Sequence, residues 1–207
     1  KSALAGEEWV TWPISTVRNI LLLMTTLQAN GQLSPPKVWQ REDGQFVAEV
    51  LPANAIDRLL YLGYRGEVWI EPGMMPTQGQ IYREPTAGKV ALILGAGNVS
   101  AIVAMDTLSK LFSENQVVIV KMNPVNAYVG EYLAQAFEPL IQAGLLQIVD
   151  GGAEVGEYLC QHPQIETIHI TGSHQTHDAI VWGVNPIEQQ ECKAANYPRI
   201  TKPITSE

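Results

Sequence analysis

The chain has 207 residues, enough for one or two domains of ordinary size. It carries 13 Lys and Arg against 21 Asp and Glu, a net charge of −8 at pH 7, and this argues against a nucleic-acid binder, which needs a basic surface to meet phosphates. Hydrophobic residues make up 46% of the chain, which excludes a disordered protein, and charged residues only 16%, which indicates that a partner or more chain covers part of the surface.

No segment resembles a membrane span or a secretion signal. The longest apolar cluster, residues 20–24, is far shorter than the roughly 20 residues that cross a bilayer. The two cysteines, Cys160 and Cys192, form neither a CxxC motif nor a disulfide pattern. We therefore expect a cytoplasmic protein with no membrane partner. Because the chain starts with Lys1 and stops at Glu207, we also expect it to be cut from a longer one.

Residues 1–82 predict a small mixed α+β region. Apolar residues three and four apart predict a helix over residues 14–28, with Asn30 and Gly31 as its stop. The elements expected after it are a strand over 46–51, a short helix over 55–62 and a strand over 67–71.

From Lys89 onward, continuous apolar runs alternate with helical segments. The expected strands are 90–94, 116–121, 145–149 and 166–170, and the expected helices are 99–112, 125–143 and 153–160. Strands without polar alternation are buried on both faces, and their alternation with helices implies a parallel sheet. We predict an α/β fold in which a Rossmann-like parallel sheet with flanking helices, residues 83–207, follows the smaller amino-terminal region.

Small and polar residues gather where these strands end, and ligands of parallel sheets bind at that edge. Residues 95–98, GAGN, could bring backbone amides and Asn98 to a ligand, or form an ordinary turn with Asn98 as a helix N-cap. Lys121 could donate to ribose or phosphate, or be a solvated strand-end charge. Residues 171–173, TGS, open a helix and suit a pyrophosphate, and they also form a capping turn.

Three histidines, His169, His174 and His177, lie close together in the sequence, and the last two share a helix face. A metal site is conceivable, but apart from the adjacent Asp178 a third ligand is not evident. We interpret them as surface histidines and predict no metal.

Taken in order, these segments resemble the amino-terminal, cofactor-binding part of the aldehyde dehydrogenase superfamily from about Arg83 to Glu207. The matching pieces are REPTAG at 83–88, similar to the family's REPxG; Gly97-Asn98; VVIVK at 117–121; Gly152 and Gly156; ITGS at 170–173, similar to FTGS; and ITKPITSE at 200–207.

The resemblance implies NAD- or NADP-dependent oxidation of a small-molecule aldehyde to a carboxylic acid, by attack of a cysteine thiolate and hydride transfer to nicotinamide. It implies that Asn98 donates to the developing oxyanion and that Glu207 is the general base. The cofactor-binding residues it implies are Gly95, Ala96, Lys121, Asn123, Pro124, Gly152, Gly156, Thr171, Gly172 and Ser173. Among these, Lys121 would hold the adenosine ribose, Ser173 the pyrophosphate, and Thr171 with Gly172 would lie near the nicotinamide.

The sequence also departs from the family pattern. The glutamate often found after the lysine is missing from residues 121–124, KMNP, which leaves both NAD and NADP open, and the usual Pro-Trp before the asparagine is Ala96-Gly97. Neither Cys160 nor Cys192 matches the nucleophile, which the family places downstream of the glutamate. We therefore expect a cofactor-binding fragment that is inactive alone, from a parent that is a homodimer or homotetramer.

Two alternatives remain open. One is an acyl-CoA or acyl-thioester reductase of the same superfamily, which the Asn-Pro after the lysine and the divergent Gly-Asn turn would fit. The other is a non-enzymic nucleotide-binding module that uses the sheet only as a scaffold.

Overall fold

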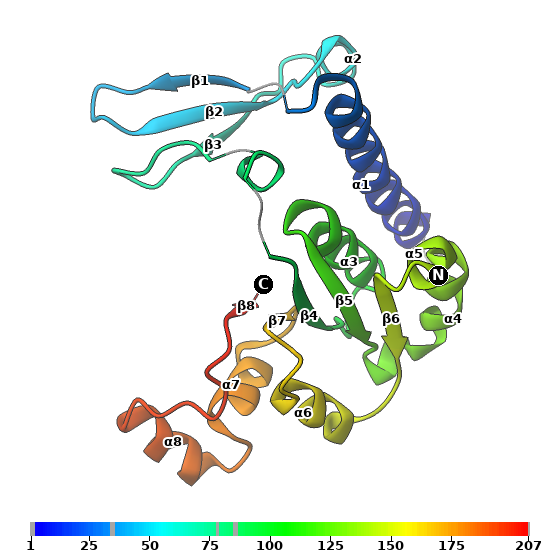
Figure 1. The fold of residues 1–207 in the computed structure, drawn as a ribbon, viewed down its shortest axis with the longest axis vertical. Helices are drawn as coiled ribbons and strands as arrows, with labels where there is room; N and C mark the ends of the chain where they lie inside the picture. The colour runs from blue at the N-terminus through cyan, green and yellow to red at the C-terminus, as the bar shows by residue number, and fades with distance from the viewer. Residues whose placement is uncertain (1–2, 34–35, 78, 85–86, 207) are drawn as a thin grey trace. The chain divides into compact units, whose positions relative to one another are not determined.

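The structure, a computed structural model, describes residues 3–33, 36–77, 79–84 and 87–206 (Figure 1). The chain divides into two compact units. The first, the five-stranded unit, consists of Lys1–Ile20 and Thr86–Glu207, and the second, the three-stranded unit, consists of Leu21–Pro85. A search of the described helices finds none that could serve as a membrane-spanning segment.

Helix α1 (Ala3–Asn30) is longer than the helix predicted over residues 14–28, and Pro13 lies inside it. Its predicted stop is confirmed. Gly31 has the positive φ of 69° that glycine tolerates, and its N–H donates to the carbonyl of Leu27 (2.8 Å), which ends the helix.

The three-stranded unit holds an antiparallel sheet in the order β1-β2-β3. Its elements are β1 (Lys37–Gln40), β2 (Phe46–Leu51), α2 (Ala55–Leu60), β3 (Gly66–Trp69) and the 3₁₀ helix η1 (Gln80–Tyr82). Val47 on β2 is 1% exposed. The guanidinium of Arg41 lies 4.1 Å from the ring centre of Trp69, which is a cation–π contact. The predicted mixed α+β region is confirmed.

The five-stranded unit is built on a parallel sheet in the order β6-β5-β4-β7-β8. Its strands are β4 (Lys89–Leu94), β5 (Gln116–Lys121), β6 (Leu146–Val149), β7 (Thr167–Ile170) and β8 (Ile204–Ser206). The first strand is central, so the chain builds the sheet to one side and then crosses β4 to build the other. The predicted parallel sheet is confirmed with all four predicted strands. The edge strand β8 was not predicted, because its three residues contain a single apolar side chain.

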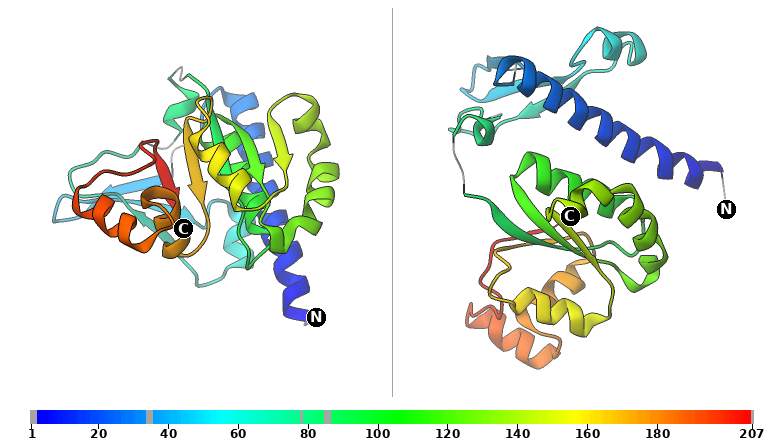
Figure 2. Two further views of the ribbon diagram at one scale, coloured as in Figure 1. Left: turned by 90° about the horizontal axis from the view of Figure 1, so that it is seen from below. Right: turned by 45° about the vertical axis from the view of Figure 1, so that its right-hand side comes forward.

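Helices cover both faces of this sheet (Figures 1 and 2). One face carries α3 (Ile102–Ser113), α4 (Gly130–Ala136) and α5 (Glu138–Gln142), and the other carries α6 (Ala153–Gln161) and α7 (His174–Trp182). Helix α8 (Pro186–Ala194) packs on α7. Leu92 and Ile93 are neighbours on β4 that belong to opposite cores, and both are 0% exposed. This burial on both faces explains why the strand has no polar alternation.

The single helix predicted over residues 125–143 is wrong. The segment contains the 3₁₀ helix η2 (Pro124–Val129), then α4 and α5, with Phe137 both ending α4 and preceding α5. Pro139 has no N–H and cannot continue the hydrogen-bond ladder of α4, so the helix breaks there. Helix α3 also starts later than predicted, at Ile102 instead of residue 99.

Candidate functional site

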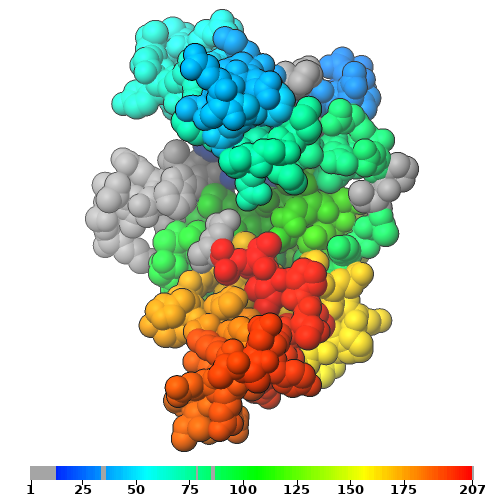
Figure 3. All heavy atoms as spheres, turned by 90° about the vertical axis from the view of Figure 1, so that its left-hand side faces the viewer, coloured from blue at the N-terminus to red at the C-terminus, as the bar shows by residue number. Residues whose placement is uncertain are grey.

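A cleft of about 830 Å³ lies at the carboxyl ends of the parallel strands. Residues at the ends of β4, β5 and β7 and residues of α6 and α7 line it. The cleft lies where the strand order reverses, between β4 and β7, which is the position where open α/β sheets bind ligands. Its volume falls in the range of cofactor sites. Figure 3 shows α7, α8 and β8 of the same unit in orange to red, with α6 in yellow beside them.

Most residues expected from the resemblance come together here. Those that line the cleft are Gly95, Asn98, Lys121, Asn123, Gly156, Thr171, Gly172 and Ser173. Three others lie outside its lining: Ala96, which is 3% exposed, Pro124, which opens η2, and Gly152, whose N–H donates to Glu154 Oε1 (3.1 Å). Glu207 lies outside the described residues.

The turn after β4 approaches the end of β5 closely. The N–H of Gly95 donates to the carbonyl of Lys121 (3.0 Å), and a Cβ on Gly97 would come within 3.0 Å of Asn123 Nδ2. Asn98 is exposed in the cleft, and its Oδ1 accepts from the N–H of Val99 (3.0 Å). Helix α3 has Ala101 at its N-cap position, so the interpretation of Asn98 as an N-cap is wrong.

Lys121 is a buried cation, only 7% exposed. Desolvation lowers the pKa of its ammonium group, and the carboxylates of Glu154 and Asp150 partly oppose this shift. The interpretation of Lys121 as a solvated strand-end charge is therefore wrong. A buried ammonium group that lines a cleft favours an anionic or hydroxyl-rich ligand.

The turn over residues 171–173 joins β7 to α7. Ser173 caps the helix, because its Oγ accepts from the N–H of Thr176 (3.3 Å), so the predicted capping turn is confirmed. The same turn lines the cleft, which brings the positive end of the α7 dipole to it. The capping turn and a pyrophosphate site are compatible. Thr171 is anchored elsewhere, through its Oγ1 to Asp106 Oδ2 on α3 (3.0 Å).

The sequence interpretation missed other residues of the site and its surroundings. Glu157 on α6 and Arg199 both line the cleft and approach each other to 3.5 Å, and Asp106 holds Thr171 from outside the cleft. None of these belongs to a local motif, so only the fold brings them together. The prediction of a surface histidine is wrong for His169, whose side chain is 7% exposed. Among the residues that the structure describes, no group of three His, Cys, Asp or Glu could hold a metal ion.

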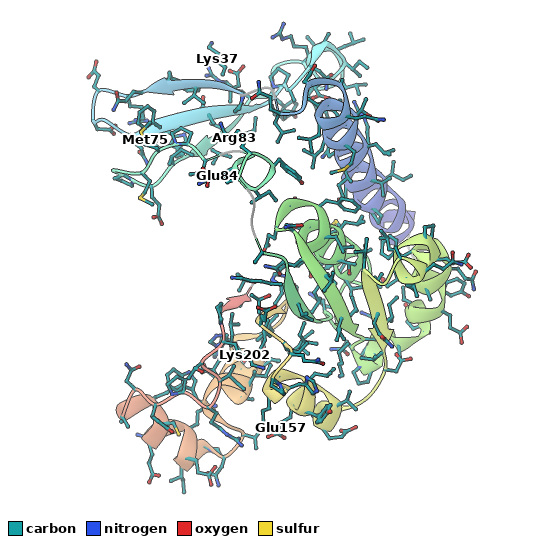
Figure 4. The ribbon with its side chains drawn as sticks, in the orientation of Figure 1. Lys37, Met75, Arg83, Glu84, Glu157 and Lys202 are labelled. Atoms are coloured by element: carbon teal, nitrogen blue, oxygen red, sulfur yellow. The ribbon has the colours of Figure 1, made fainter. Side chains whose placement is uncertain are left out.

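The two cysteines differ in their surroundings. Cys160 lines the cleft but is 2% exposed, and burial raises the pKa of its thiol to about 11. Since the thiolate is the nucleophile, this burial makes the thiol unreactive at neutral pH. Lys202 Nζ donates to the carbonyls of Cys160 (2.8 Å) and His162 (2.6 Å), closing the end of α6; Figure 4 labels Lys202 and, on α6, Glu157. Cys192 lies in α8 and is not among the residues that line the cleft.

Known proteins match the chain over most of its length. The description "Aldehyde dehydrogenase family" belongs to a family model that matches residues 2–185. The chain is 30% identical to 4-trimethylaminobutyraldehyde dehydrogenase of Homo sapiens over 99 residues, 47% of this chain and 20% of that protein. It is 30% identical to aldehyde dehydrogenase tropH of Talaromyces stipitatus over 143 residues, 67% of this chain and 27% of that protein.

The chain therefore spans between 20% and 27% of the length of these two curated relatives. Among solved structures, HpcC from Thermus thermophilus aligns with a TM-score of 0.49 and 13% identity, covering 94% of this chain and 29% of that one. Because the family model covers far more than half of the residues, the chain belongs to the aldehyde dehydrogenase family.

Proposed function

We propose that this chain forms the NAD- or NADP-binding part of an enzyme that oxidises a small-molecule aldehyde to a carboxylic acid. The proposal assigns residues 83–207 to the dinucleotide-binding domain and residues 1–82 to an amino-terminal region. The observation that carries it is the convergence of Asn98, Lys121 and Ser173, from three separate strand ends, on one cleft. Membership of the aldehyde dehydrogenase family supports it.

The residues of the cleft fit a dinucleotide. Lys121 supplies a buried donor for ribose hydroxyls, and Ser173 with the first amides of α7 supplies donors for a pyrophosphate. Gly95 and Gly97 keep the turn after β4 thin enough to lie against β5, which leaves space above the sheet for a ligand. When bound, the nicotinamide would accept the hydride from the substrate.

Two residues are proposed for the chemistry. The carboxamide of Asn98 would donate to the aldehyde oxygen as it gains negative charge, and Glu207 would accept a proton as general base. We assign the nucleophile to neither cysteine of this chain, because Cys160 is buried and protonated and Cys192 lies outside the cleft lining. We therefore propose that the 207-residue chain alone does not turn over aldehyde. Sustained NADH or NADPH production by this chain would contradict that part of the proposal.

Isothermal titration calorimetry of this chain with NAD⁺ and with NADP⁺ tests the binding part of the proposal directly. We expect saturable binding of at least one of them, and binding of neither would overturn the proposal. In the parent enzyme, NAD(P)H production from aldehyde and water supports oxidation to the acid, whereas a strict need for CoA would support the acyl-thioester reductase alternative.

We also propose that the parent is a cytoplasmic homodimer or homotetramer. The low content of charged residues, 16%, favours a covered surface, and both cysteines are free thiols, which suits a reducing compartment. Sedimentation equilibrium of the parent enzyme tests the oligomeric state, and a monomer would contradict it.

A further inference from the structure

A cluster of polar side chains lies directly behind the turn over residues 171–173. Thr171 Oγ1 is 3.0 Å from Asp106 Oδ2, and His169 Nε2 is 3.4 Å from both of these atoms. On the other side of the ring, His169 Nδ1 is 2.8 Å from Thr205 Oγ1, which also lies 3.2 Å from Lys110 Nζ. The side chains of Asp106, His169 and Lys110 are only 11%, 7% and 6% exposed.

One arrangement of hydrogens satisfies all of these contacts. An ammonium group only donates, so Thr205 Oγ1 accepts from Lys110, and its own hydrogen is available to His169 Nδ1. With Nδ1 as the acceptor, the ring hydrogen lies on Nε2, which faces Thr171 Oγ1 and Asp106 Oδ2 at 3.4 Å each. The Asp106 carboxylate accepts from the Thr171 hydroxyl.

The cluster holds Thr171 and does not activate it. In a Ser-His-Asp arrangement, the two ring nitrogens face different partners, with the carboxylate on one and the hydroxyl on the other. Here Nε2 faces both Asp106 and Thr171, and the Thr171 hydrogen goes to the carboxylate. The hydroxyl is therefore a fixed donor and not a nucleophile.

We propose that Asp106 and His169 are positioning residues that hold Thr171, and through it the turn over residues 171–173, in the shape that binds the cofactor. The inference rests on the proposed function. Thr171 lines the cleft, whereas Asp106, His169 and Thr205 lie outside its lining. Removing the hydrogen bonds of His169 therefore lowers cofactor affinity without removing any residue of the cleft wall.

The test is the dissociation constant of NAD⁺ or NADP⁺, whichever the wild-type chain binds, measured by calorimetry. His169→Leu removes both ring contacts, and we expect the Kd to rise about tenfold, the usual effect of losing one hydrogen bond that orders a site. His169→Gln can keep a donor near the Nε2 position, and we expect its Kd to stay within about twofold of wild type. Asp106→Asn keeps the shape of its side chain but weakens the acceptor of the Thr171 hydrogen bond, and its Kd should rise as well.

Thr171→Val and Thr167→Val form a matched pair. Thr167 is the first residue of β7, and Thr171 directly follows its last residue. Thr167 Oγ1 bonds Gln116 (3.0 Å) at the opposite end of β7, so its loss should lower the melting temperature and leave the Kd unchanged. If His169→Leu behaves like Thr167→Val, with a lower melting temperature and an unchanged Kd, the role is structural and the inference fails while the proposed function stands. If the wild-type chain binds neither dinucleotide, both fail.

Long-range ¹⁵N–¹H spectra of the histidine rings give a second readout, which does not depend on the cofactor. The chain has four histidines, so the ring signals of His169 can be assigned by their loss in His169→Gln. In the folded chain we expect the tautomer that carries its hydrogen on Nε2. A ring protonated on Nδ1 would overturn the assigned donor order and with it the inference.

Discussion

At the residue scale, burial changes the pKa of a lysine that lines the cleft. Lys121 is a cation at 7% exposure in a chain of net charge −8, and desolvation lowers the pKa of its ammonium group. Burial disfavours the charged form of the ammonium group. A ligand that accepts hydrogen bonds from it offsets this cost and is therefore bound favourably. A second lysine, Lys89, is the first residue of β4 and lies at the amino ends of the parallel strands, opposite the cleft. Substituting each lysine in turn separates the contribution of Lys121 at the cleft from the effect of the chain's net charge.

Lys121→Met should weaken cofactor binding. The substitution keeps the aliphatic length and removes charge-assisted hydrogen bonds worth about 1.5–3 kcal/mol, so we expect the Kd of NAD⁺ or NADP⁺ to rise by roughly 10- to 100-fold. Calorimetric titration measures it. The control Lys89→Met removes the same charge from the chain, and its Kd should match wild type. Equal losses in the two variants would assign the effect to net charge instead of to Lys121.

Cys160 makes stability depend on pH in the alkaline range. Its thiol has a pKa of about 11 in the folded chain and an ordinary value of 9.0 when exposed. Because the folded value is the higher one, the stabilisation is fully present below pH 9 and is lost as the pH rises through 11. At about 1.36 kcal/mol per unit, the loss is on the order of 3 kcal/mol. Urea unfolding at about pH 8 to 11 should show it as a difference between wild type and Cys160→Ala.

The partly buried Cys192 provides the control for that measurement. Cys192→Ala should follow the wild-type pH dependence, so only Cys160→Ala flattens the curve. A difference that stays constant across the whole alkaline range would show that the Cys160 thiol titrates alike in the folded and unfolded chains.

At the element scale, the start of α7 combines a helix cap with a cleft residue. Ser173→Ala should cost about 1 kcal/mol in the free energy of unfolding, because the N–H of Thr176 loses its acceptor, and should also raise the Kd of the cofactor. Asn185 caps α8 in the same way, through the N–H of Ile187 (2.9 Å), but lies outside the cleft lining. Asn185→Ala should therefore lose similar stability and keep its Kd. If both variants bind normally, Ser173 is only a cap.

The elements that the sequence predicts well are those with a strong local pattern. The strand over 90–94 was evident because burial on both faces removes every polar residue from its middle. The sequence predicts one helix where the structure has α4 and α5, because apolar residues continue on both sides of Pro139. The edge strand β8 carries too little apolar sequence to be recognised before its neighbour β7 is in place.

The candidate site divides in the same way. Residues at strand ends could be predicted to meet, because parallel strands end at one edge, and Asn98, Lys121 and Ser173 do line one cleft. The bond between Thr171 and Asp106 joins positions 65 residues apart and belongs to no motif. This hydrogen bond depends on how α3 packs across the sheet. Side-chain packing determines that arrangement, and the periodicity of apolar residues in the sequence does not reveal it.

At the scale of the whole molecule, the two compact units have separate cores. Every described residue that lines the cleft belongs to the five-stranded unit. The three-stranded unit has its own buried residues on β2, with Val47 at 1% and Ala48 at 6% exposure. Stability and cofactor affinity should therefore be separable by substitutions in the two cores.

Val47→Ala and Ile93→Ala test this separation. Val47→Ala removes two buried methyl groups from the three-stranded unit and should cost about 2 kcal/mol of stability, while the Kd of the cofactor stays within twofold of wild type. Ile93→Ala opens a cavity in β4, one residue before the strand end at the cleft, and should cost about 2–5 kcal/mol and weaken binding as well. Calorimetry and thermal unfolding measure both quantities. A tenfold loss of affinity in Val47→Ala, measured where the variant is still folded, would contradict this separation.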